Sequence, residues 1–147
     1  MLDVKCNAEI KHLNCRKEVH GEENVFANDV KLMLLGVPVD RLGSLCPDMG
    51  KHFYDGDVVA VGEVNPLTVG HKIENLKVKI EKESLNGVDL KKGAKIHLQP
   101  NKLANVECSI QVADISDSTF AELRRLYLEG EAMVVITERQ QTLSAVQ

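Results

Sequence analysis

The residues of this chain best suited to covalent chemistry are its thiols and imidazoles. Cys46, with His52 or His71, has the residue types of a thiol nucleophile and its general base. Such a pair needs hydrogen-bonding distance, a lowered thiol pKa and a third residue that orients the base. The spacing supplies none of these, and Cys46 falls on the apolar stripe of its segment. We therefore interpret Cys46 as a buried core thiol and the chain as a non-enzyme.

A second group, His12, Cys15 and His20 with Cys6 nearby, has the side chains of a metal site. Structural zinc sites normally show two closely spaced ligand pairs, which this group lacks. Cys6 also lies on an apolar strand face, where a thiol serves as a small hydrophobic side chain. The adjacent acids Glu22 and Glu23 fit a solvated turn, and the glycine-rich loops that bind phosphates are absent. We predict neither a metal nor a cofactor.

Charge is the more informative feature. The chain carries a formal net charge of −4, whereas the segment 72–102 has eight basic and four acidic residues, leaving −8 elsewhere. The lysines able to form a phosphate-binding or partner-binding face are Lys72, Lys77, Lys79, Lys91, Lys92 and Lys95. Exposed strand lysines also serve simply to prevent edge-to-edge aggregation. Proteins that bind single strands usually add aromatic platforms, but this chain has no Trp, and most of its Phe and Tyr residues, Phe26 included, lie on core-facing patterns.

The elements that position these residues are mostly strands. Apolar residues alternate with polar ones over residues 2–10, then the phase slips near His12, which predicts a strand with a β-bulge. A turn at residues 20–24 leads into a second strand that contains Phe26 and Leu34, so the opening reads as a hairpin. Residues 39–54 have helical spacing interrupted by Pro47, which predicts two short helical turns with Pro47 starting the second.

The remainder follows the same pattern of strands and turns. Strands are predicted at residues 58–64, 71–83, 95–99, 104–115 and 132–137, with a hairpin turn at Asn86-Gly87. The best helix covers residues 116–129, with Asp117 or Ser118 as its N-cap and Gly130 just past its end. Strands joined by short turns predict a mainly β fold, with α+β as the alternative. The expected architecture is an antiparallel β-sandwich or partly open barrel with two short helices.

Length and composition limit the class of protein. With 147 residues, 44% hydrophobic and 27% charged, the chain suits one globular domain, which we place at residues 1–138 with a polar tail at 139–147. No apolar run is long enough to span a membrane, and the N-terminus lacks a signal-peptide layout, so we expect a cytoplasmic protein with free thiols.

The opening hairpin, with its sequence 16–23 (RKEVHGEE), the segment from Leu45-Cys46-Pro47 to Phe53-Tyr54, and the C-terminal strand-helix-strand together resemble uncharacterised proteins of bacteriophage and prophage genomes. The resemblance implies a phage setting inside a bacterial host cell, with no catalytic or binding residues attached to it. We expect a small accessory protein that binds a protein partner, either itself as a homo-oligomer or a host defence or replication component. The alternative is an accessory factor of phage recombination or replication that contacts single-stranded DNA through the lysine-bearing segment.

Overall fold

A computed structural model describes residues 1–60 and 65–138, apart from the side chains of residues 18, 20 and 23–25. The predicted tail at 139–147 and the end of the strand predicted at 58–64 lie outside the described residues. The strands are β1 (Asp3–His20), β2 (Glu23–Pro38), β3 (Tyr54–Asp55), β4 (Val58–Val59), β5 (Leu67–Thr68), β6 (Ile73–Ile80), β7 (Glu83–Leu90), β8 (Lys95–Gln99), β9 (Leu103–Ala113) and β10 (Glu131–Glu138). The helices are α1 (Met49–His52) and α2 (Asp117–Glu129), with 3₁₀ turns at Val39–Arg41 and Pro100–Lys102.

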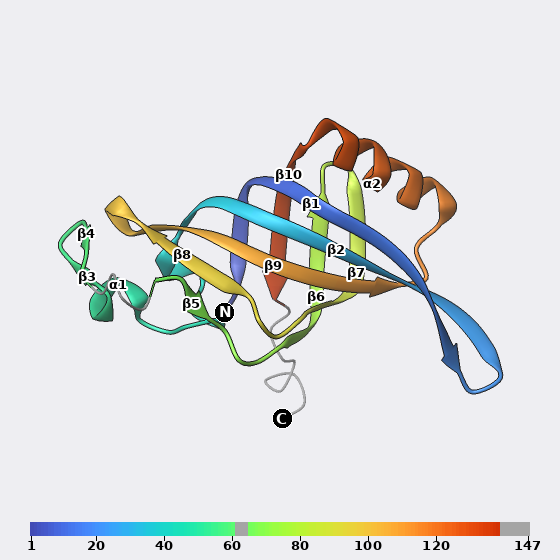
Figure 1. The fold of residues 1–147 in the computed structure, drawn as a ribbon, viewed down its shortest axis with the longest axis horizontal. Helices are drawn as coiled ribbons and strands as arrows, with labels where there is room; N and C mark the ends of the chain where they lie inside the picture. The colour runs from blue at the N-terminus through green and yellow to red at the C-terminus, as the bar shows by residue number, and fades with distance from the viewer. Residues whose placement is uncertain (61–64, 139–147) are drawn as a thin grey trace, which may run out of the picture.

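Six of the strands close into a barrel (Figure 1). Their order is β2-β1-β10-β6-β7-β9, and β9 pairs back onto β2, with every neighbouring pair antiparallel. The predicted mainly β class with two short helices is confirmed. The barrel is closed because β2 is long enough to pair with β1 on one side and β9 on the other. Among the described residues, no helix has the length and apolar character that a membrane crossing requires.

Aliphatic side chains from alternate positions of each strand fill the barrel. Leu32, Ile110 and Val134 are fully buried, as period-two patterning requires. All four thiols are free. Cys6 and Cys108 lie in this core, and burial raises the pKa of Cys108 to about 12, so both act as small hydrophobic side chains.

The predicted bulge in β1 is confirmed. Ile10 pairs with Leu32 and His12 with Lys31, so Lys11 is the extra residue. The bulge changes which side chains face inward, because it shifts the alternation by one position. Even-numbered side chains face the core before it, whereas Leu13 and Cys15 take the inner side after it.

The hairpin turn predicted at Asn86-Gly87 is wrong. β6 and β7 pair as far as Ile80 and Glu83, so the chain turns at residues 81–82. A two-residue turn at 86–87 would set Glu83 opposite Leu90. In the observed register Leu90 lies opposite Ile73, and Val88 lies opposite Leu76. Gly87, with φ +64, takes a bulge within β7 instead.

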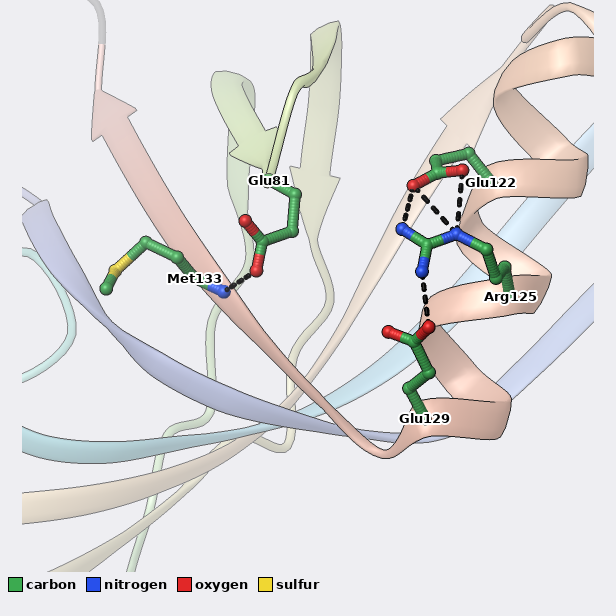
Figure 2. A network of polar contacts seen from close by, with 5 residues as sticks. All are labelled: Glu81, Glu122, Arg125, Glu129 and Met133. Carbon is green, nitrogen blue, oxygen red and sulfur yellow. Dashed lines mark hydrogen bonds and ion pairs between the residues drawn. The ribbon is translucent and has the colours of Figure 1, made fainter.

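Glu81 extends the ladder between β6 and β10 beyond the last strand residue. Its backbone N–H donates to the carbonyl of Met133 (2.9 Å), and its Oε1 accepts from the N–H of Met133 (3.0 Å; Figure 2). The carboxylate therefore takes the place of a strand carbonyl, which keeps the start of β10 paired.

The helices are confirmed with shifted ends. α1 begins at Met49, two residues after Pro47. The N-cap of α2 is Ser116, whose Oγ accepts from the N–H of Thr119 (3.1 Å), so the prediction of Asp117 or Ser118 is wrong. Gly130 ends α2 in the left-handed conformation, as predicted. Leu123 and Leu126 are buried, and α2 packs on β1 and β10.

Candidate functional site

The hairpin of β1 and β2 extends beyond the barrel (Figure 1). Pairing of β1 with β10 ends at Glu9, and pairing of β2 with β9 ends at Ala27, yet β1 and β2 remain paired to His20 and Glu23. Residues 16–26 are therefore a two-stranded arm, and no third strand from the described residues lies on either edge. We call this segment the arm.

The face of the arm that continues the barrel interior carries exposed apolar side chains. Phe26 lies opposite Lys17, and Val19 is two positions further along β1, so all three share this face. Val19 is 71% exposed and Phe26 59% exposed. The prediction that Phe26 faces the core is wrong. The pairing of β2 with β9 stops at Ala27, so no strand in the described part of the chain covers Phe26.

A hollow lies where the arm leaves the barrel, between the inner face of the hairpin and the start of α2. Its volume is about 200 Å³, and we call it the arm pocket. It is lined by Cys15, Phe26, Asn28, Ile115, Asp117 and Phe120. The N–H of Asp114 donates to the carbonyl of Phe26 (3.3 Å), which ties the loop before α2 to the arm.

Asn28 contributes an unusual polar group to this pocket. Among the described residues it is the single polar side chain in the buried class, at 2% exposure, and its Oδ1 has no hydrogen-bond partner there. An unpaired buried acceptor costs about 1–3 kcal/mol. Val112 and Cys15, its neighbours in the ladder, lie on either side of it. Buried acceptors without a partner are uncommon in folded proteins, so Asn28 is a candidate binding group.

α2 brings Asp117 and Phe120 to the pocket from its first turn. The hydrogen bond from Thr119 to Ser116 sets where this turn begins, and Asp117 suits the positive end of the helix dipole. Further along the helix, Arg125 bridges Glu122 and Glu129 (Figure 2). These exposed ion pairs stabilise α2 away from the pocket. Asp117, which lines the pocket, takes no part in them.

The structure divides the six predicted lysines between different parts of the outer surface. Lys72, Lys91 and Lys92 line one shallow hollow, together with His71. Lys92 also lines a second hollow, together with Lys95 and Lys31. Lys31 was not among the lysines predicted from the sequence. Lys77 and Lys79 are exposed on β6, next to β10, and line neither hollow. The sequence signal for Lys31 was its place on the polar side of β2.

Carboxylates partner several of these cations. Lys91 Nζ lies 3.1 Å from Asp29, which also accepts from Arg16 Nε at 2.7 Å. Burial would raise the pKa of Asp29, but these two cations outweigh it and lower the pKa. Lys31 pairs with Glu107 at 2.9 Å and Lys72 with Glu74 at 3.2 Å. Among the described residues, Lys77, Lys79, Lys92 and Lys95 have no ion-pair partner.

The thiol and imidazole groups singled out in the sequence are not assembled into a site. In the described part of the chain, no hydrogen bond joins Cys46 to His52 or His71, and His71 Nε2 instead contacts the carbonyl of Ser44 at 2.8 Å. Burial raises the pKa of Cys46, which opposes thiolate formation.

The residues considered as metal ligands are also separated. Cys6 is in the core, Cys15 is exposed at the arm pocket, and His12 shares the outer face with Lys31. The side chain of His20 lies outside the described residues. Within the described ranges, no three His, Cys, Asp or Glu side chains form a group able to hold a metal ion.

No protein-family model, curated protein or solved structure matches this chain. The resemblance to phage proteins therefore stays a prediction, and the features of the structure that bear on function are the arm, the arm pocket and the lysine-lined hollows.

Proposed function

We propose that this chain is a non-enzymatic protein-binding module that contacts its partner through the inner face of the arm and the arm pocket. The observation that carries the proposal is the exposure of Val19 and Phe26 on one face, beside a hollow lined by Asn28, whose buried Oδ1 has no hydrogen-bond partner among the described residues. Apolar side chains grouped on a projecting element are typical of interaction sites rather than of a solvated surface.

The rest of the fold supports this function. In the described part of the chain, each of the six barrel strands pairs with a neighbour on both sides, and the barrel holds the base of the arm on β9 and β10. The arm, in contrast, has no neighbouring strand on either edge within the described ranges, and beyond the bond of Phe26 to Asp114 its backbone can add hydrogen bonds to a partner. In the phage setting that the sequence resembles, the partner is a second copy of the chain or a host defence or replication protein.

Site-specific photo-crosslinking in the producing cell tests the proposal. A photoreactive amino acid at position 26 is expected to yield a discrete crosslinked product, because this residue would lie in the interface. The matched control is position 58 on β4, where Val58 is 67% exposed but far from the arm in sequence and fold. Equal products from both positions, or none from position 26, would contradict the proposal.

A second candidate function is contact with single-stranded DNA. It is favoured by the two hollows that share Lys92 and by the unpaired Lys95. Log affinity for an oligonucleotide should then fall with log salt at a slope of roughly −0.7 per phosphate contact. The double variant Lys92→Glu with Lys95→Glu should abolish binding, while Lys77→Glu with Lys79→Glu tests whether the β6 lysines take part. The absence of binding at low salt rejects this candidate.

A further inference from the structure

The charged and unpaired groups of the arm pocket specify the kind of side chain that suits it. The charged group is the carboxylate of Asp117, which has no ion-pair partner among the described residues, and the unpaired polar atom is the acceptor Asn28 Oδ1. Of the described residues, none that lines the pocket is cationic. An occupant that supplies hydrogen-bond donors and positive charge would satisfy both groups.

The apolar lining of the pocket favours a guanidinium over an ammonium group. Phe26 and Phe120 contribute two aromatic rings and Ile115 an aliphatic surface. A cation over an aromatic face is attracted by the ring quadrupole, and the planar guanidinium also stacks on such faces. Its five donors can reach two separate acceptors, whereas the ammonium of lysine is a compact and strongly hydrated charge.

The size of the hollow indicates a single side chain. Pockets for drug-sized ligands run from roughly 300 to 1,000 Å³, and the arm pocket, at about 200 Å³, is smaller. Arginine is also among the side chains that most often anchor protein interfaces. The residues that line the pocket all lie outside segment 72–102. This remainder of the chain carries a formal charge of −8, which attracts basic partners.

We propose that the arm pocket binds an arginine side chain of a protein partner. The guanidinium stacks on Phe26 and Phe120, pairs with the Asp117 carboxylate and donates to Asn28 Oδ1. The inference rests on the proposed function, since it names the partner chemistry of the same surface.

Selection from a random peptide library on the full chain, followed by calorimetric titration of the enriched peptides, tests this assignment. The selected peptides should share one arginine. Replacing that arginine by citrulline, which keeps the shape and removes the charge, should abolish measurable binding, and lysine should weaken it about tenfold. These comparisons change only the peptide, so they do not depend on the folding of a variant.

Variants of the chain locate the binding. Asp117→Asn and Asn28→Leu should each lower the affinity for the arginine peptide at least tenfold. Asp114→Asn removes the same charge three residues earlier, outside the pocket lining, and should change affinity less than threefold.

The outcomes separate the two proposals. Arm-dependent peptides that lack arginine, or that tolerate citrulline or Asp117→Asn, would overturn the arginine assignment and leave the binding module intact. Enriched peptides that bind equally well after Phe26→Ala and Val19→Ser, or a failure to enrich any peptide, would overturn both.

Discussion

The side chain of Asn65 makes both hydrogen bonds to Leu98 that a neighbouring strand would make. Its Nδ2 donates to the carbonyl of Leu98 (3.1 Å), and its Oδ1 accepts from the N–H of Leu98 (2.8 Å). Leu98 lies in β8, whose outer edge β5 covers only at Lys95 and Ile96. The amide of Asn65 therefore occupies the backbone groups of β8 beyond the end of β5. This prevents the exposed edge of β8 from pairing with another chain at Leu98.

Asn65→Ala should lower the free energy of unfolding by about 1–3 kcal/mol, because it leaves both backbone groups of Leu98 unpaired. Asn65→Asp, which keeps the acceptor and loses the donor, should fall between Ala and wild type. Urea denaturation gives the energies, and light scattering should show faster aggregation of the Ala variant. Asn7→Ala, at an exposed position on β1, is the control and should stay within about 0.5 kcal/mol. A loss of that small size for Asn65→Ala would mean that the amide does not replace a strand.

Asn28→Leu should raise the free energy of unfolding by about 1 kcal/mol, because an apolar group of similar shape removes the desolvation cost of the unpaired Oδ1. The companion variant Asn28→Asp should be destabilised by roughly 3 kcal/mol or more, since it buries a charge. Thermal and urea denaturation both report these changes. If the Leu variant were less stable than wild type, the amide would be making structural bonds and its value as a binding group would fall.

Ser116→Ala should destabilise the protein by about 1 kcal/mol, since Ser116 is the residue that accepts from the N–H of Thr119. Ser118→Ala is the matched control, because among the described residues its exposed hydroxyl contacts only the Ser116 Oγ. The two variants compared in one denaturant series decide between the observed cap and the one that the sequence pattern favoured. A larger loss of stability for Ser118→Ala than for Ser116→Ala would instead favour the predicted cap at Ser118.

Gly130→Ala should cost about 1–2 kcal/mol, because Gly130 has φ +97 and a side chain is strained there. Gly70→Ala adds the same methyl group at a position with ordinary φ and open space, and should be neutral within about 0.5 kcal/mol. Circular dichroism at 222 nm during denaturation measures both. A neutral Gly130→Ala would show that α2 can end one residue differently without loss.

Asp29→Asn tests the ion pairs with Arg16 and Lys91 through pH. The pKa of Asp29 is lower in the folded chain than its ordinary value near 3.8, so its contribution is fully present above that value and is lost as pH falls through the folded pKa. The stability difference between wild type and variant should be constant from about pH 7 to pH 5 and shrink below about pH 4. Urea denaturation across pH 3–7 measures it. The exposed pair of Lys72 with Glu74 provides the control Glu74→Gln, for which the difference should be near zero throughout. A difference that grows in acid would contradict the sign.

The sequence by itself determined the kinds of element and much of their placement. Apolar side chains such as Leu32 and Val134 alternate because a strand has a period of two, and this local rule also revealed the bulge near His12 and the αL end of α2 at Gly130. The partner of each strand follows from no such rule. Asn86-Gly87 is the stronger turn signal, yet the turn forms at Glu81-Lys82, because that register buries Leu85, Val88 and Leu90.

The candidate site depended still more on tertiary structure. Phe26 has the pattern of a core residue and is exposed, because β9 stops pairing at Ala27 and leaves the hairpin without a third strand. Asn28 and Asp117, far apart in sequence, line one hollow only because the barrel closes and α2 begins beside the arm. Local sequence patterns report which face a side chain takes within its own strand. Where each strand loses its neighbour, and what lies across the gap, is set by the closure of the whole barrel.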